Sequence, residues 1–183
     1  MAELVKVVVD AMGGDLAPVE PVKAAVEAVK ERKDILVILT GQEEVIHPTD
    51  RIQVVNATEV IETAEPPVFA IRKKKDSSIV VGLKMVKEQK ADAFVSSGST
   101  GAVLVGGQVL VGRSKGVERP PLAPLIPTAK GVSLLIDCGA NVDARPSHLV
   151  QFAKMGSIYM EHVVGIKNPR VAIVNIGAEE EKG

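Results

Sequence analysis

A short run of glycine and hydroxyl residues, Ser96 to Gly101, has the composition of an anion-binding loop. It follows the apolar residues Ala93 to Val95 and precedes the apolar run Ala102 to Val111, an order that predicts strand, loop and helix. Glycine lets the backbone approach a ligand, and the free N–H groups at a helix start favour negative charge. We interpret the loop as a binding site for phosphate or a phosphate-like group, with an ordinary Gly/Ser turn as the alternative.

Two further loops place carboxylates and glycines after apolar, strand-like runs. One follows the run Leu4 to Val9, and the other follows Val132 to Ile136. Asp and Asn in such loops can orient a donor or stabilise an oxyanion, although the same residues are typical of turns. The candidate residues in these loops are Asp10, Gly13, Gly14, Asp15, Asp137, Asn141 and Asp143.

Metal-binding and covalent chemistry have weaker support in the sequence. The aspartates of these loops could supply oxygen ligands to Mg²⁺, but nothing fixes their distances, and we predict no metal. The three histidines lack metal-type spacing. His148, at a predicted helix start, is the one candidate acid or base, although we favour a surface role for it. Cys138, the single cysteine, is either an acyl-accepting nucleophile or, as we favour, a small buried residue.

Basic residues cluster from Arg72 to Lys75 and recur at Lys84, Lys87 and Lys90. A solvated helix face is the ordinary explanation of such a stretch. The functional alternative is a docking surface for an acidic protein or an anionic membrane surface. Lys182 follows the last predicted strand, where it can bind phosphate or belong to a frayed end.

The elements that would position these residues alternate between strand-like and helix-like patterns, which predicts an α/β fold. We expect one domain over residues 1–183, with a mostly parallel, Rossmann-like sheet and helices on both faces. Strands are expected at 4–9, 35–39, 52–55, 93–95, 132–136 and 171–176. The proline-rich segment 113–128 offers a further candidate strand at 122–126. Helices are expected to begin near Pro18, Pro67, Ser77, Ala102 and Ser147. The loops 10–15, 96–101, 137–143 and 177–183 would then share one rim of the sheet and form a ligand cleft.

Bulk composition excludes several classes of protein. The chain of 183 residues has a net charge of −1, so its overall electrostatic potential does not attract nucleic acid. It has three Phe, one Tyr and no Trp, too few aromatic side chains to stack on bases. A single cysteine allows no intrachain disulfide and suits a reducing cytoplasm. The N-terminus lacks the pattern of a signal peptide, and no apolar run reaches the roughly 18 residues of a membrane span.

Several motifs stand together in a family-specific order. They are VDAMGGD from Val9, SGSTGA from Ser97, VGR from Val111, RP from Arg119 with AP from Ala123, DCGANVD from Asp137, HLVQFA from His148 and EKG from Glu181, with the basic run Arg72 to Lys75 before Ser77 and Ser78. Over essentially its whole length the chain resembles the bacterial phosphate acyltransferases of phospholipid synthesis, the acyl-carrier-protein:phosphate acyltransferases. At position 99 this family often has Asn, so in this chain a hydroxyl replaces an amide.

The resemblance implies transfer of a fatty acyl group from acyl carrier protein to inorganic phosphate, giving an acyl phosphate, without a cofactor. It implies a three-layer α/β/α sandwich of the isocitrate dehydrogenase and phosphate acetyltransferase type. It also implies a cytoplasmic homodimer, loosely associated with the inner face of the membrane, of which this chain is the N-terminal part. The alternatives are a nicotinamide-dependent dehydrogenase, disfavoured because no Gly-x-Gly-x-x-Gly follows the first strand, and a non-catalytic membrane-associated binding module.

Residue roles follow from the loops and the resemblance together. We expect catalytic roles for Lys182, Asn141 and Asp10. We expect phosphate or substrate binding by Gly13, Gly14, Asp15, Ser97, Gly98, Ser99, Thr100, Gly101, Asp137, Asp143 and His148. The residues expected to dock the carrier protein are Arg72, Lys73, Lys74 and Lys75.

Overall fold

The computed structural model describes residues 3–46, 51–141 and 143–174. Its contacts divide the chain into two compact units, Met1–Ser114 and Lys115–Gly183, which we call the first and the second unit and describe separately. The expectation that residues 1–183 form a single domain stays a prediction.

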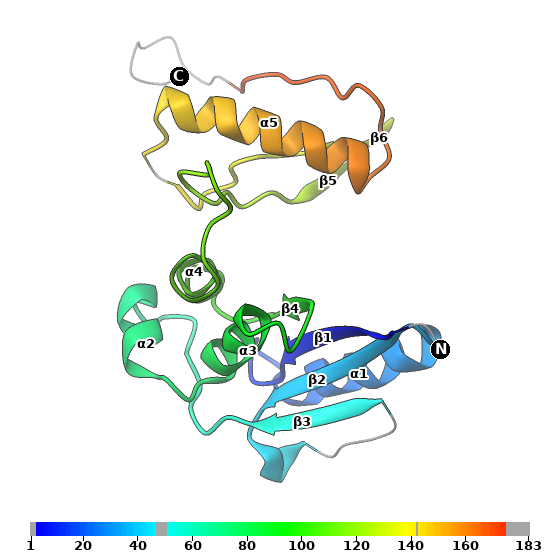
Figure 1. Ribbon diagram of the computed structural model, residues 1–183, viewed down its shortest axis with the longest axis vertical. Coiled ribbons are helices and arrows are strands. Elements are labelled where there is room, and N and C mark those ends of the chain that lie inside the picture. Colours follow the sequence, from blue (N-terminus) through cyan, green and yellow to red (C-terminus); the bar gives the residue numbers. More distant parts are fainter. Residues whose placement is uncertain (1–2, 47–50, 142, 175–183) are drawn as a thin grey trace. The chain divides into compact units, whose positions relative to one another are not determined.

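A parallel sheet forms the centre of the first unit (Figure 1). Its strands are β1 (Val5–Asp10), β2 (Ile35–Gly41), β3 (Ile52–Asn56) and β4 (Ala93–Val95), in the order β3-β2-β1-β4. Every pairing is parallel, and Val9 lies opposite Leu39 on one side and Val95 on the other. The carboxyl ends of β1 and β4 are therefore neighbours, as the predicted α/β fold requires.

Alternating side chains of β2 show that both faces of the sheet are covered. Val37 and Leu39 are buried in one core with residues of α1 (Val19–Glu31). Ile38 is buried in another core with residues of α3 (Ser78–Lys87). A strand covered on both faces is apolar almost throughout, which explains the continuous hydrophobic run of β2. The predicted layers of helix, sheet and helix are confirmed.

Three shorter helical segments and one π-helix complete the first unit: η1 (Glu43–Val45), α2 (Pro67–Lys73), α4 (Thr100–Gly106) and η2 (Gly107–Val111). Helices α2, α3 and α4 bury a common apolar core that includes Ile71, Leu83 and Ala102. Ser77 caps α3, since its hydroxyl accepts a hydrogen bond from the Val80 N–H at 3.4 Å. The sequence predicted α2 and α3 in these places, as well as the cap.

The second unit contains a hairpin and one long helix. Strands β5 (Leu125–Thr128) and β6 (Gly131–Leu134) pair antiparallel, and α5 spans Pro146–His162. The prediction of a buried strand at 132–136 in the parallel sheet was wrong, because β6 pairs with β5 and is largely exposed. The tight turn between Thr128 and Gly131 joins the two strands directly, and a two-residue connection permits only antiparallel pairing.

Two other expectations are changed by these elements. Residues 171–174 are not in a strand, and the remainder of the predicted strand lies outside the described residues. Of the four loops expected on one rim, those at 10–15 and 96–101 follow strands of the parallel sheet, the one at 137–143 follows the hairpin, and 177–183 lies outside the described residues. In the described part of the chain, no helix has the length and hydropathy of a membrane span.

Candidate functional site

The loops after β1 and β4 meet through hydrogen bonds and close backbone contact. Asp10 is only 1% exposed, and its Oδ2 accepts the Ser96 hydroxyl at 2.7 Å while its Oδ1 accepts the Met12 N–H at 3.0 Å. The Ser96 Oγ also accepts the Gly98 N–H at 3.0 Å. Asp10 therefore connects two loops that are far apart in the sequence.

Glycine is required where these loops touch. A Cβ on Gly13 would lie 2.4 Å from Asp10 Oδ2 and 2.8 Å from the Gly98 nitrogen, which no real side chain permits. Gly14 has a φ of +99°, and its Cβ would lie 3.2 Å from the Cβ of Ser97. The predicted site residues Asp10, Gly13, Gly14, Ser97 and Gly98 are thus brought together, and the glycines allow it.

Ser99 begins the helix that follows the loop. Its side chain is 3% exposed, and its Oγ accepts the Ala102 N–H at 3.3 Å as the N-cap of α4. A hydroxyl in this position satisfies one of the N–H groups that have no acceptor within a helix. Ser99 is therefore a capping residue here.

Exposed groups of this loop remain available to a ligand. The side chains of Ser97 and Thr100 are exposed, and Asp15 is exposed on the neighbouring loop. The N–H groups of Thr100 and Gly101 occupy the first helical positions, which have no acceptor inside a helix. Backbone N–H groups and hydroxyls of this kind can bind the oxygens of an anion.

Asp137 organises a turn in the second unit. Its Oδ1 accepts the N–H groups of Leu122 at 2.6 Å and Ala140 at 3.3 Å, and its Oδ2 accepts the Asn141 N–H at 2.6 Å. Partial burial raises the pKa of Asp137, but these hydrogen bonds and one from the Asn141 side chain lower it, and the net pKa is below the ordinary value. Its carboxylate is occupied by hydrogen bonds from the protein.

Asn141 uses its amide within the same turn. Its Nδ2 donates to Pro120 O at 3.1 Å and to Asp137 Oδ2 at 3.2 Å. Both amide hydrogens therefore have acceptors, and donation to an oxyanion would require one of them to be exchanged. The geometry brings the predicted residues Asp137 and Asn141 together.

His148 is buried rather than on the surface, so the favoured expectation of a surface role at the helix start was wrong. Only 4% of it is exposed, and its Nε2 lies 3.1 Å from Glu118 Oε2. Its Nδ1 accepts the Arg145 N–H at 3.1 Å, so the proton of a neutral ring is on Nε2. Both ring nitrogens have partners, and His148 joins the start of α5 to the segment that contains Glu118.

The remaining candidates fall into three cases. Cys138 is exposed, so the expectation of a small buried residue was wrong. Asp143 is also exposed. Lys182 lies outside the described residues. Within those residues no group of three or more His, Cys, Asp and Glu side chains is arranged to hold a metal, and the absence of a metal requirement stays a prediction.

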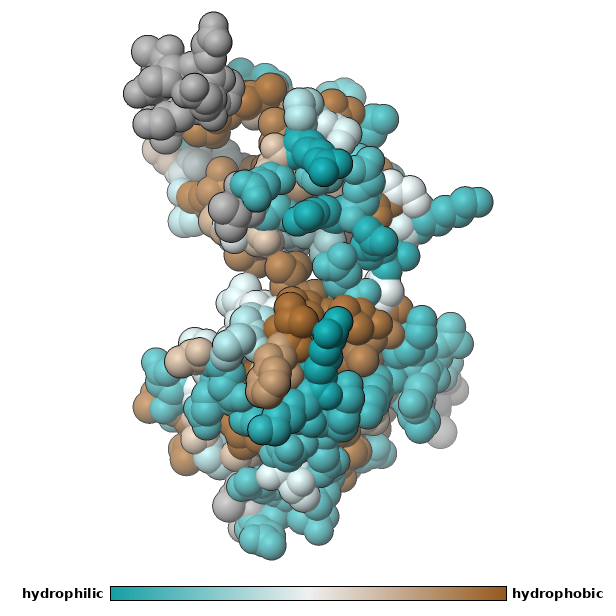
Figure 2. All heavy atoms as spheres, turned by 90° about the vertical axis from the view of Figure 1, so that its left-hand side faces the viewer, coloured by the Kyte–Doolittle hydropathy of each residue, from teal (hydrophilic) through white to brown (hydrophobic). Residues whose placement is uncertain are grey.

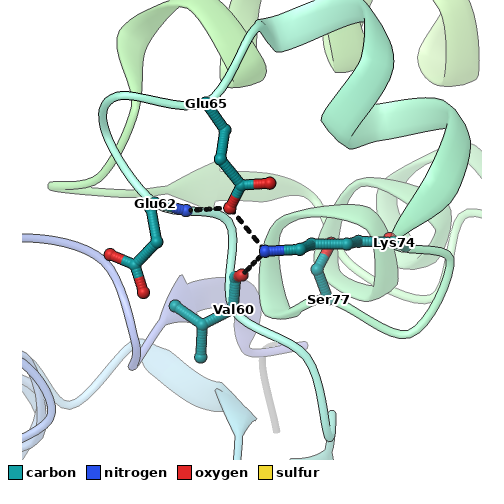
Figure 3. A network of polar contacts seen from close by, with 5 residues as sticks. All are labelled: Val60, Glu62, Glu65, Lys74 and Ser77. Atoms are coloured by element: carbon teal, nitrogen blue, oxygen red, sulfur yellow. Dashed lines mark hydrogen bonds and ion pairs between the residues drawn. The ribbon is translucent and has the colours of Figure 1, made fainter.

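Lys74 of the basic stretch is held by the segment before α2 (Figure 3). The Lys74 ammonium group forms an ion pair with Glu65 and donates to Val60 O at 2.5 Å. The hydrogen bond from Lys74 lowers the pKa of Glu65, and a second one from the Glu62 N–H at 2.8 Å acts in the same direction. Lys74 thus holds the segment before α2 in place. Its ammonium group is already paired, so it is a weaker candidate for docking the carrier protein than its neighbours.

The rest of the basic stretch is exposed beside apolar side chains. Arg72, Lys73 and Lys75 are exposed, although the Lys75 ammonium donates to Ile71 O at 3.2 Å. The Lys73 ammonium lies 5.4 Å from the centre of the Phe69 ring. On the same short helix Val68 and Phe69 are 51% and 57% exposed. Figure 2 views the side of the first unit on which α2 lies, and hydrophobic atoms gather there beside hydrophilic ones.

Sequence reasoning missed two residues at these sites. Ser96 was read as part of the glycine loop and not selected, although its hydroxyl joins the two loops of the first unit. Glu118 lies in a proline-rich segment with little periodicity, and it contacts His148 and Gln151. The signal for Ser96 was its place directly after β4, beside the end of β1, whereas no signal pointed to Glu118.

These features define a class: an α/β protein with a candidate anion-binding site at the carboxyl end of a parallel sheet. The chain belongs to the family described as fatty acid synthesis protein, whose model matches residues 5–183. It resembles the solved branched-chain phosphotransacylase of Enterococcus faecalis V583 with a TM-score of 0.56 and 14% identity, covering 86% of this chain and 51% of that one. At that identity the likeness concerns the fold alone.

Curated relatives are much closer in sequence. A phosphate acyltransferase of Alkaliphilus oremlandii (strain OhILAs) is 55% identical over 97% of this chain and 55% of its own length. A phosphate acyltransferase of Clostridium novyi (strain NT) is 51% identical over 97% of this chain and 56% of its own length. The chain thus spans about half the length of the curated relatives it matches.

Proposed function

We propose that this chain is part of a phosphate acyltransferase that transfers a fatty acyl group from acyl carrier protein to inorganic phosphate. The observation that carries the proposal is the junction of the Asp10 and Ser96 loops. There Gly13 and Gly98 lie in close contact, and the residues after Gly98 present exposed hydroxyls and N–H groups. The names of the relatives and their identity to this chain support the choice of reaction. The homodimer and the peripheral membrane association implied by the resemblance belong to the same proposal.

Phosphate itself is the nucleophile in this reaction. One of its oxygens forms a bond to the thioester carbonyl carbon, and the carbon–sulfur bond of the resulting tetrahedral intermediate breaks. The thiol of the carrier protein leaves and acyl phosphate remains, so no covalent enzyme intermediate is needed. The protein must hold phosphate close to the carbonyl and stabilise the oxyanion.

The candidate residues divide between these tasks. Gly13, Gly14, Asp15 and the loop Ser97 to Gly101 hold phosphate, and Asp10 fixes the two loops against each other. In this proposal Asn141 and Lys182 bind phosphate or stabilise the oxyanion, and Asp137 orients Asn141. Asp143 and His148 remain proposed phosphate- or substrate-binding residues.

The reaction is tested with the full-length protein. Purified enzyme is supplied with palmitoyl–acyl carrier protein and ³²P-labelled phosphate, and the labelled acyl phosphate is extracted into organic solvent, away from free phosphate. We expect labelled acyl phosphate and free carrier thiol in equal amounts. Carrier thiol released without acyl phosphate would identify a thioesterase and contradict the proposal.

Two substitutions test the assigned roles. Lys182→Ala and Asn141→Ala are each expected to lower acyl-phosphate formation by about 10²-fold, the scale for losing an oxyanion donor. Lys167→Ala is the matched control, because Lys167 is an exposed lysine without an assigned role. Near-normal turnover in both variants would contradict the assignment.

The carrier-docking proposal is sharpened by the structure. Since Lys74 is held by Glu65, the docking surface is restricted to Arg72, Lys73 and Lys75. Arg72→Glu combined with Lys73→Glu should raise the KM for acyl carrier protein and leave the KM for phosphate unchanged. Lys30→Glu with Lys33→Glu makes the same charge change at other exposed positions and should alter neither constant. An unchanged carrier KM in the first pair would refute docking at α2.

A further inference from the structure

Ser96 lies where the two loops meet, and the mechanism above gives it no role. It directly follows β4, and it lies beside Asp10, the last residue of β1. Its Oγ is 2.7 Å from Asp10 Oδ2 and 3.0 Å from the Gly98 nitrogen. One hydroxyl therefore links the two loops and also closes the turn within its own loop.

The direction of these hydrogen bonds is fixed by the chemistry of the groups. A carboxylate only accepts, so the single hydrogen of the Ser96 hydroxyl is directed to Asp10. Its lone pairs are then left for the Gly98 N–H, which only donates. The opposite oxygen of Asp10 accepts the Met12 N–H, so the nearly inaccessible carboxylate has a donor on each oxygen.

The backbone around this hydroxyl leaves little room for rearrangement. A Cβ on Gly98 would lie 3.1 Å from the Gly13 Cα and 3.2 Å from Ser96 Oγ. The corresponding atom on Gly13 would lie 2.9 Å from Ser96 Oγ. The hydrogen bond between Ser96 and Asp10 therefore lies at the point where the two loops are packed most closely.

We propose that Ser96 is a positioning residue for phosphate. Its hydroxyl holds the loop Ser96 to Gly101 on Asp10, so that the exposed hydroxyls and N–H groups of the loop are arranged before phosphate binds. This inference rests on the proposed function of the loop. It separates Ser96, which acts through other groups, from Ser97 and Thr100, whose exposed hydroxyls would touch the anion.

The test compares Ser96→Ala with Ser96→Thr in the full-length enzyme. Ser96→Ala should raise the KM for phosphate about tenfold, the scale for losing a hydrogen bond to a charged group, with the KM for acyl carrier protein unchanged. Ser96→Thr retains a hydroxyl and should keep the KM for phosphate within about threefold of the wild type. Calorimetric titration with inorganic phosphate should show the same order of affinities.

Ser77→Ala is the matched structural control. The Ser77 hydroxyl is also buried between backbone groups, donating to Lys74 O at 2.9 Å and accepting the Val80 N–H. Its loss should lower the unfolding temperature without a selective change in the KM for phosphate. If Ser96→Ala leaves phosphate binding unchanged, or raises both KM values equally, the inference is wrong.

Two further outcomes are covered by the same experiment. If Ser96→Ala does not fold, Ser96→Cys replaces it, since the thiol has a similar shape but is a weaker hydrogen-bond donor and acceptor than the hydroxyl. Wild-type affinity for phosphate in Ser96→Cys would then contradict the inference. If the wild type makes no acyl phosphate, the proposed function fails, while calorimetry with phosphate still decides the role of Ser96.

Discussion

Asp10 ends strand β1 and Asp137 comes shortly after β6, and each has a glycine within the next three residues, but the two aspartates stabilise different kinds of structure. Asp10 is 1% exposed, and one of its two hydrogen bonds comes from Ser96, 86 residues away. Asp137 is partly exposed, and its donors lie within 15 residues, at Leu122 and at positions 140 and 141. The first aspartate joins two loops of a parallel sheet, whereas the second closes a turn beside a hairpin.

The glycines of the two loops show the same difference. Gly14 and Gly139 have almost equal φ values, +99° and +98°. A Cβ on Gly14 would meet Ser97 at 3.2 Å, whereas a Cβ on Gly139 would have open space around it. The Asp10 loop therefore needs glycine for both conformation and contact, and the Asp137 loop needs it for conformation alone.

The largest effect is expected from Gly13→Ala. Its Cβ would overlap Asp10 Oδ2 and the Gly98 nitrogen, so the loops must separate, and acyl-phosphate formation should fall by about 10²-fold, as for a misplacement near 1 Å. Gly107→Ala is the control, because no atom lies within 4 Å of that Cβ and the residue is helical. Equal turnover in the two variants would show that the close contact at Gly13 is not needed for activity.

An intermediate effect is expected from Asp137→Ala. The N–H groups of Leu122, Ala140 and Asn141 lose their acceptor, and the free energy of unfolding should fall by about 1–3 kcal/mol. Urea denaturation measures the change, and exchange of these three amide hydrogens should accelerate. The affinity for phosphate, measured by calorimetry, should fall less than in Gly13→Ala. A larger loss of phosphate affinity in Asp137→Ala than in Gly13→Ala would show that the Asp137 turn matters more for phosphate binding than the contact at Gly13.

Acid should act on the Asp137 turn. The pKa of Asp137 in the folded protein lies below its ordinary value of 3.8, so its carboxylate stabilises the fold above that pH. This stabilisation is lost as the pH falls through the lowered folded pKa. Unfolding temperatures measured between pH 5 and about 2.5 should fall less steeply in Asp137→Asn than in the wild type. Parallel curves of unfolding temperature against pH for the two proteins would show that the Asp137 carboxylate does not stabilise the fold.

The smallest effect is expected from Gly139→Asn. Asn tolerates a positive φ better than other residues with a side chain, and the site has open space, so the cost should be at most about 1 kcal/mol. Gly14→Asn adds contact with Ser97 to the same conformation and should cost more. Thermal unfolding of both variants checks the order, and equal losses would mean that conformation alone matters at Gly14.

Local pattern was enough to predict most of the first unit. The apolar runs predicted β1 to β4, and the Asp76–Ser77 signal predicted the start of α3, which the Ser77 hydroxyl caps. Parallel strands align their carboxyl ends, so the meeting of the loops after β1 and β4 follows from strand order. The same reasoning failed for residues 132–136, because an apolar run does not specify its pairing partner.

The sequence by itself determined the alternation of elements, the glycine-containing loops and the family. The tertiary structure decided which polar groups are free and which are already bonded. Lys74 is held by Glu65, Ser99 caps α4, and His148 is buried against Glu118. Hydrogen bonds and burial depend on neighbours that are distant in the sequence. The hydrogen bond from Ser96 to Asp10 exists only because β1 and β4 pair side by side, so local sequence could not predict it.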